Sequence, residues 1–138
     1  MVDELEAQLP SSKTILVVED DTDNEEVLEL IITSETSYQA LVMESGREVL
    51  ERIEEIKAVK PALFLLDYHL PAMTALELYD QLHKIEAFKH IPALIVSASQ
   101  PGPIVYEIAK RGLTFLEKPF EVDTLLTTIK RILDTPFT

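Results

Sequence analysis

Apolar residues follow two alternating patterns along the chain, and each pattern occurs five times. Short runs of four to six residues are almost continuously apolar, which is typical of strands in a parallel sheet covered by helices on both faces. The longer segments between them repeat apolar residues every three or four positions, as one face of an amphipathic helix does. The predicted strands span residues 15–18, 38–43, 62–66, 93–96 and 113–116.

Helix start signals support three of the predicted helices. In a capping box, a Ser or Thr and a Glu three residues later satisfy each other's backbone N–H groups. Thr22 with Glu25, Ser45 with Glu48 and Thr74 with Glu77 fit this pattern. Strands and helices that alternate so regularly form right-handed βαβ units. The sequence therefore predicts an α/β fold with a doubly wound five-stranded parallel sheet. For its strand order we expect 2-1-3-4-5, the flavodoxin-like (βα)5 topology, which is one of the common doubly wound orders.

The length of 138 residues suits one domain, which we expect to span residues 13–134. Residues 1–12 are predicted to be a flexible leader and residues 135–138 a short tail. The absence of cysteine excludes disulfides and thiolate chemistry. The start of the chain lacks the basic and apolar segments of a secretory signal, and no apolar run is long enough to span a bilayer, so we expect a cytoplasmic protein.

The net charge of −13 restricts the partners that the protein can bind. Twelve Lys and Arg residues stand against 25 Asp and Glu residues, so nucleic acids and anionic membrane surfaces are repelled. We therefore expect neither a nucleic-acid nor a membrane partner. Acidic proteins bind basic patches on other proteins, and we expect protein partners, with a homodimer left open.

Residues that can do chemistry follow four of the predicted strands. Glu19 and Asp20 follow the first strand, Asp67 the third, Ser97 the fourth and Lys118 the fifth. Ligand sites of open α/β sheets lie at the carboxyl ends of the strands, and in the predicted order the first and third strands are neighbours. Three converging carboxylates and one ammonium favour a divalent hard cation such as Mg²⁺. With that cation, Asp67 could act as a nucleophile toward a phosphoryl group.

Four motifs at these strand ends together resemble the receiver domain of two-component response regulators. They are residues 15–21 (ILVVEDD), 65–71 (LLDYHLP), 95–98 (IVSA) and 115–120 (FLEKPF). The resemblance covers almost all of residues 13–134. It implies that Asp67 is the phosphoacceptor, that Asp20 and Asp67 bind Mg²⁺ directly, and that Glu19 binds it through water.

The resemblance also implies roles for residues on the other loops. The backbone carbonyl of His69 is expected to be a further metal ligand. Ser97 resembles the hydroxyl that binds the phosphoryl group, Lys118 its cationic partner, and Phe115 the switch aromatic. The Lys118–Pro119 bond is typically cis in the family. The implied partners are a sensor histidine kinase or a histidine phosphotransfer protein as donor, and a downstream protein that the sequence does not identify.

Two segments depart from the family pattern. Ala75 stands where the family usually has a glycine, and a positive φ at that position would strain the backbone. Pro101 and Pro103 stiffen the loop after Ser97, which moves on activation in the family. These departures keep an alternative open, in which the chain is a degenerate receiver that acts as a phosphorylation-independent interaction module.

Enzymatic functions fit the sequence less well. Aspartate-nucleophile phosphatases of the haloacid dehalogenase type carry a second acid two residues after the nucleophile, where this chain has His69. Kinases and nucleotide hydrolases need a glycine-rich phosphate loop, which the three scattered glycines do not provide. His83, Glu86 and His90 have helical metal-site spacing, but the helix is expected to end before Pro92, so we interpret them as surface residues. We therefore predict a signalling domain that catalyses only its own phosphorylation and dephosphorylation.

Overall fold

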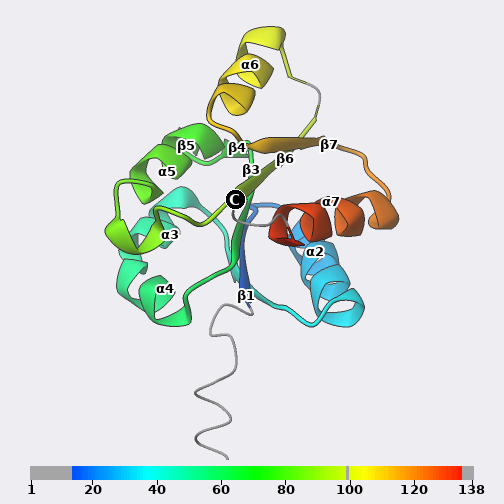
Figure 1. Ribbon diagram of the computed structural model, residues 1–138, viewed down its shortest axis with the longest axis horizontal. Helices are drawn as coiled ribbons and strands as arrows, with labels where there is room; N and C mark the ends of the chain where they lie inside the picture. The colour runs from blue at the N-terminus through cyan, green and yellow to red at the C-terminus, as the bar shows by residue number, and fades with distance from the viewer. Residues whose placement is uncertain (1–13, 99, 135–138) are drawn as a thin grey trace, which may run out of the picture.

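The computed structural model describes residues 14–98 and 100–134, so the predicted leader and tail lie outside the described residues. Five parallel strands form one sheet in the order β2-β1-β3-β6-β7 (Figure 1). They are β1 (Thr14–Val18), β2 (Gln39–Met43), β3 (Leu63–Asp67), β6 (Ala93–Ser97) and β7 (Thr114–Glu117). Counted along the sheet strands alone, this order is 2-1-3-4-5, which confirms the predicted topology.

Helices cover both faces of the sheet (Figure 1). One face is covered by α2 (Thr22–Glu35) and α7 (Val122–Asp134). The other is covered by α3 (Gly46–Glu51), α4 (Ile53–Val59) and α5 (Ala75–Leu82), with α6 (Gly102–Lys110) beside β7. The sheet is thus the middle layer of three, as a doubly wound fold requires.

The residues of β1 show why the strand segments are continuously apolar. Successive side chains of a strand point to opposite faces of the sheet. Leu16 and Val18 pack in the core beneath α3, α4 and α5, whereas Ile15 and Val17 pack in the core beneath α2 and α7. All four side chains are fully buried, and burial of a side chain of this size stabilises the fold by roughly 1.5–3 kcal/mol.

The start of α2 differs from the predicted capping box. The helix is capped by Asp21, whose carboxylate accepts a hydrogen bond from the backbone N–H of Asn24 at 3.0 Å. The predicted pairing of Thr22 with Glu25 is wrong, because Thr22 is already the first residue of the helix. Aspartate caps helices as well as threonine does, so the run Asp20-Asp21-Thr22 offers several alternative starts.

The other two helix starts agree with the sequence more closely. Ser45 caps α3 by accepting from the backbone N–H of Glu48 at 3.0 Å. The box is not reciprocal as predicted, because the Glu48 carboxylate accepts from the N–H of Glu44 instead of that of Ser45. At α5 the complete box of Thr74 and Glu77 is confirmed, with hydrogen bonds of 3.2 and 2.9 Å.

A short antiparallel hairpin that the sequence did not predict follows β3. It consists of β4 (His69–Leu70) and β5 (Met73–Thr74). The strained residue in this segment is Ala72, with a φ of 68°. The condition for strain at Ala75 is not met, since Ala75 is the first residue of α5 and does not have a positive φ. The tight turn between β4 and β5 requires a left-handed backbone conformation at Ala72, which lies before the start of α5.

Two of the helical segments between the sheet strands are interrupted or end early. The helix after β2 is divided at Arg52 into α3 and α4. The helix after β5 ends at Leu82, and a 3-10 turn, η1 (Glu86–Phe88), continues toward β6. Local helix breaks of this kind leave the spacing of apolar residues nearly unchanged, so periodicity does not reveal them.

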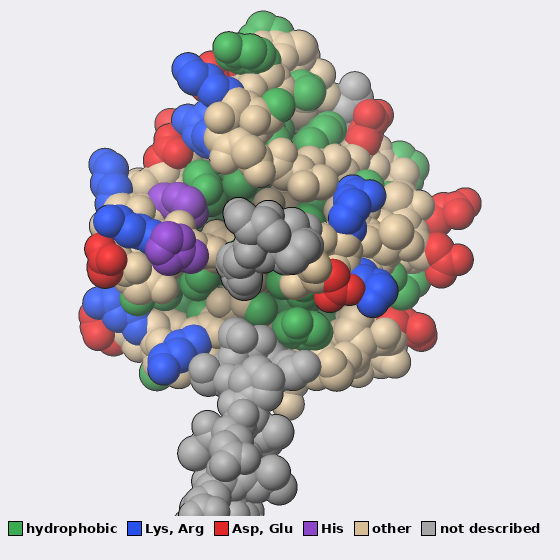
Figure 2. Space-filling model, in the orientation of Figure 1, with side chains coloured by type: hydrophobic (Ala, Val, Ile, Leu, Met, Phe, Trp, Pro, Cys, Tyr) green, Lys and Arg blue, Asp and Glu red, His purple; other side chains and the backbone are tan. Residues whose placement is uncertain are grey.

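Within residues 14–98 and 100–134, no helix is long and apolar enough to cross a membrane. On the face shown in Figure 2, the Lys and Arg side chains are distributed around the rim among Asp and Glu side chains. The expected absence of nucleic-acid partners is untested by these observations and stays a prediction.

Candidate functional site

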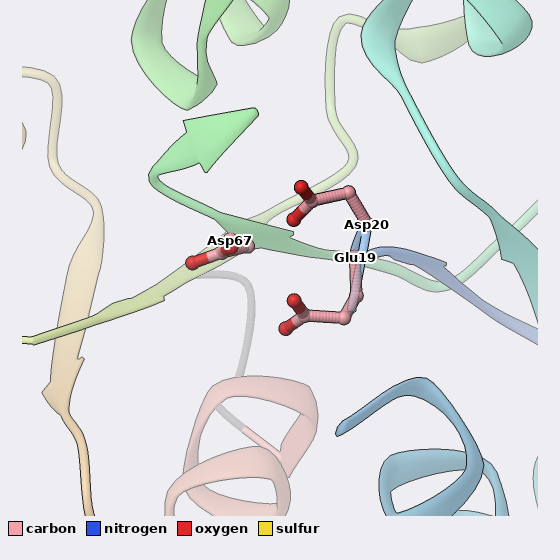
Figure 3. Close-up of side chains that lie close together, drawn as sticks. All are labelled: Glu19, Asp20 and Asp67. Carbon is pink, nitrogen blue, oxygen red and sulfur yellow. The ribbon is translucent and has the colours of Figure 1, made fainter. Parts of the chain in front are cut away.

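Three carboxylates at two neighbouring strand ends form an acidic cluster. Glu19 and Asp20 directly follow β1, and Asp67 is the last residue of β3, with which β1 pairs. One carboxylate oxygen from each residue lies within 4.8 Å of the other two. In Figure 3 the side chains of Glu19 and Asp20 extend toward Asp67. The structure thus brings together the three acids that the sequence placed at one edge of the sheet.

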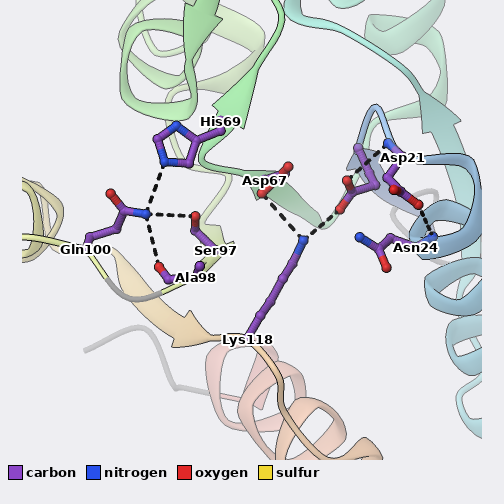
Figure 4. Close-up of polar contacts among 9 residues, drawn as sticks. Asp21, Asn24, Asp67, His69, Ser97, Ala98, Gln100 and Lys118 are labelled. Atoms are coloured by element: carbon purple, nitrogen blue, oxygen red, sulfur yellow. Dashed lines mark hydrogen bonds and ion pairs between the residues drawn. The ribbon is translucent and has the colours of Figure 1, made fainter.

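Lys118 supplies the positive charge nearest to these carboxylates. Its Nζ lies 3.1 Å from Oε1 of Glu19 and 3.6 Å from Oδ1 of Asp67 (Figure 4). The Glu19 side chain is 1 % exposed and that of Lys118 25 %, so the carboxylate of this ion pair is shielded from solvent and the lysine is partly exposed. The backbone N–H of Lys118 donates to the carbonyl of Ser97 at 2.7 Å, which fixes the loop that carries the lysine.

The pKa of Asp67 is raised to about 6 from its ordinary value of 3.8. Burial is the main cause, followed by the negative charge of Glu19, with a smaller contribution from Asp20. The ammonium of Lys118 acts in the opposite direction but does not compensate. Burial and the two neighbouring carboxylates thus outweigh the single ammonium, and a cation bound at the cluster would favour the ionised form of Asp67.

Ser97 and His69 are connected at this edge by a residue that the sequence did not single out. The side-chain Nε2 of Gln100 lies 3.1 Å from Oγ of Ser97, 3.2 Å from Nε2 of His69 and 3.0 Å from the carbonyl of Ala98 (Figure 4). Ser97 is 2 % exposed. An amide three residues after Ser97 carries no distinctive sequence signal, so only the folded loop reveals this contact.

Phe115 lies in β7 in register with Ile95 of β6. Its side chain is partly buried against the core that α3 to α6 cover, a position that suits both a plain core residue and a switch residue. The Lys118–Pro119 peptide bond is cis, as expected for the loop after β7.

An apolar cavity of about 490 Å³ lies beside the acidic cluster. Its lining consists of Asn24, Val27, Leu28, Ala98, Lys118, Pro119 and Phe120. Lys118 thus borders both the cavity and the carboxylates. The sequence did not predict this cavity, because the start of α2 and the loop after β7 are almost 100 residues apart and meet only in the folded sheet.

Comparison with known proteins decides the family. The family model described as "Response regulator receiver domain" matches residues 15–130. The chain belongs to this family. Receiver domains are in general signalling modules of two-component systems and not enzymes, which agrees with the class predicted from the four strand-end motifs.

Relatives with known structures support the same fold. A CheY-like receiver domain protein from Methanospirillum hungatei JF-1 is 27 % identical, covers 89 % of this receiver domain's chain and 94 % of its own, and has a TM-score of 0.78. Chemotaxis response regulator CheY4 of Vibrio cholerae also has a TM-score of 0.78, with 23 % identity, over 88 % of this chain and 99 % of its own.

Curated relatives include proteins of very different length. The polar-differentiation response regulator DivK of Brucella ovis is 29 % identical over 123 residues, which are 88 % of this chain and 97 % of DivK. The hybrid signal transduction histidine kinase D of Dictyostelium discoideum is 28 % identical over 120 residues, and this receiver domain spans only 7 % of its length.

Proposed function

We propose that this receiver domain is a phosphoacceptor, which takes a phosphoryl group onto Asp67 from a phosphohistidine of a sensor histidine kinase or histidine phosphotransfer protein. The observation that carries the proposal is the position of Asp67. It ends a central strand, next to two further acids that could help to hold a metal and within 3.6 Å of an ammonium group. Carboxylate nucleophiles at such positions form acyl phosphates.

In the proposed step, an Oδ atom of Asp67 attacks the phosphorus in line with the bond to the donor imidazole. A P–O bond forms and the P–N bond breaks. The electron pair of the broken bond stays on the imidazole nitrogen, which water protonates. Lys118 pairs with the negative oxygens of the transferring group, and the hydroxyl of Ser97 donates a hydrogen bond to one of them.

The residues of the acidic cluster fit Mg²⁺. Three hard oxygen donors lie within 4.8 Å of one another, and Mg²⁺ typically binds one or two carboxylates together with water and a phosphate oxygen. Asp20 and Asp67 are the proposed direct ligands, the His69 backbone carbonyl is a further one, and Glu19 acts through water. When bound, Mg²⁺ neutralises excess negative charge at the site and on the phosphoryl oxygens.

The surface beside the cluster supports docking of a protein donor. Helix α2 carries five acidic residues and no Lys or Arg. On the same helix, Val27 and Leu30 are 54 % and 65 % exposed, and Val27 lines the apolar cavity that Lys118 borders. A donor surface with apolar side chains and surrounding Lys or Arg complements this face and brings its phosphohistidine close to Asp67.

Phosphorylation is proposed to change the surface that a downstream protein binds. Ser97 bonds the phosphoryl group, and Phe115, which packs on the core next to the strand of Ser97, repacks in response. The change is a shift between two conformations of one fold. Pro101 and Pro103 limit how far the start of α6 can move.

Incubation with acetyl phosphate, with and without Mg²⁺, tests the proposed function directly. Intact-mass spectrometry is expected to show one added phosphoryl group only in the presence of Mg²⁺. Asp67→Asn should abolish the addition, whereas Asp123→Asn, the same change at an exposed position of α7, should not. A degenerate receiver that works independently of phosphorylation predicts no labelling of the wild-type protein under any of these conditions.

A further inference from the structure

Gln100 is the one side chain in the described loops at this edge of the sheet that contacts both Ser97 and His69. Ser97 ends β6, and His69 lies two residues after Asp67 in β4. In Figure 4 the Gln100 amide nitrogen lies between these two side chains, on the opposite side of Ser97 from the acids. The amide therefore connects the hydroxyl at the end of one strand to the loop that follows the phosphoacceptor.

The hydrogen-bonding chemistry fixes the orientation of this amide. The carbonyl of Ala98 can only accept, so the Gln100 atom that lies 3.0 Å from it must be the nitrogen. The same nitrogen donates its second proton toward Oγ of Ser97, so its approach to Nε2 of His69 is a contact and not a further donated hydrogen bond. A hydroxyl whose oxygen accepts a hydrogen bond keeps its own proton free to donate, and accepting makes it a better donor.

The backbone holds Gln100 in place for this contact. Pro101 follows it directly and restricts Gln100 to extended conformations. Pro101 itself is extended, with φ −59° and ψ 153°, and caps α6. Pro101 thus limits the backbone conformations of Gln100, which lowers the entropic cost of presenting its amide to Ser97.

From these contacts we infer that Gln100 is a positioning residue for phosphoryl transfer, which directs the hydroxyl proton of Ser97 toward the phosphoryl group on Asp67. The inference rests on the proposed function, because the hydroxyl of Ser97 can donate to a phosphoryl group only if Asp67 is phosphorylated. It gives the Gln100 amide a role in phosphoryl transfer and Pro101 a role in holding that amide in place.

A double-mutant cycle tests the inference with Gln100→Met, Ser97→Ala and the double variant. Methionine keeps the length of glutamine but has no N–H donor. The rate of phosphorylation by acetyl phosphate with Mg²⁺ should fall about three- to ten-fold in Gln100→Met, the range for one neutral hydrogen bond. In the Ser97→Ala background the same substitution should change the rate by less than about two-fold, because the positioned hydroxyl is already absent.

Two measurements separate positioning from a general loss of structure. Gln81→Met makes the same chemical change on the exposed side of α5 and should leave the phosphorylation rate unchanged. The affinity for Mg²⁺, measured by calorimetry, should be the same in Gln100→Met as in the wild type, since Gln100 contacts none of the three acids and touches His69 at its imidazole, not at the backbone carbonyl proposed as a ligand.

The outcomes distinguish this inference from the proposed function. Equal effects of Gln100→Met with and without Ser97 would show that Gln100 acts independently of the hydroxyl and would overturn the inference alone. A wild-type rate in Gln100→Met overturns it as well. Failure of the wild-type protein to be phosphorylated overturns the proposed function, and the inference with it.

Discussion

The raised pKa of Asp67 predicts that the proposed phosphoacceptor destabilises the metal-free fold at neutral pH. Its carboxyl group has a pKa of about 6 in the folded protein against an ordinary 3.8. The folded state therefore binds a proton more readily than the unfolded chain does. Stability linked to this group is fully present below the ordinary pKa of 3.8 and is lost progressively as the pH rises from there through about 6.

The size of this effect follows from the difference between the two pKa values. Each unit corresponds to about 1.4 kcal/mol, so ionised Asp67 lowers the free energy of unfolding by about 2–3 kcal/mol at pH 8. Asn has the same shape and no charge. Asp67→Asn should accordingly stabilise the metal-free protein by about this amount, or raise Tm by roughly 8 °C for a domain of this size.

Thermal unfolding of the wild type and Asp67→Asn, with chelator and at several pH values from 4 to 8, checks the prediction. The difference in Tm between the two proteins should be largest at pH 8, about half as large at pH 5 and small at pH 4, because it disappears only below the ordinary pKa of 3.8. Mg²⁺ should stabilise the wild type much more than the variant, because it binds the folded acidic cluster. A difference that does not change with pH, or a variant less stable than the wild type at pH 8, would refute this reasoning.

Three further substitutions have expected outcomes that thermal or urea unfolding can measure. Arg111→Met removes the paired hydrogen bonds of 2.9 and 2.8 Å to Asp80, which join the end of α6 to α5. It should lower the free energy of unfolding by about 1 kcal/mol, a small amount because the pair is partly exposed. An unchanged stability would contradict this. Ala72→Gly relieves the φ of 68° and should stabilise by about 0.5 kcal/mol, the strain of a left-handed residue less the entropy cost of glycine; a loss of stability would count against strain there. Lys118→Met leaves Glu19 buried without its ion pair. The substitution should destabilise the metal-free protein by about 2 kcal/mol or more, and Mg²⁺ should reduce this effect. Equal stability of the variant and the wild type would contradict the importance of this pair.

The arrangement of the acids could be predicted from the sequence because parallel strands have little geometric freedom. Residues that follow β1 and β3 must meet at one edge once these strands are neighbours. Glu19, Asp20 and Asp67 are therefore located by strand order alone. The apolar runs predicted the five strands, because a strand covered on both faces has few polar residues, and their order was expected from the flavodoxin-like topology.

Features that depend on side-chain competition could not be predicted in this way. Asp21 and Thr22 are both good caps, and only the folded backbone decides that Asp21 accepts from Asn24. Ala72 has a left-handed backbone because it lies in the turn of the short hairpin formed by β4 and β5. Strands of two residues leave no recognisable pattern in the sequence, so this hairpin could not be predicted. The contact of Gln100 with Ser97 likewise depends on the path of one loop.

Identification of the phosphorylated residue tests the central claim most directly. After reaction with acetyl phosphate and Mg²⁺, borohydride reduces an aspartyl phosphate to homoserine, which peptide mass spectrometry can locate. We predict homoserine at position 67 in the wild-type protein and at no position when Mg²⁺ is withheld. Homoserine at position 20 or at another aspartate, with residue 67 unmodified, would contradict the account.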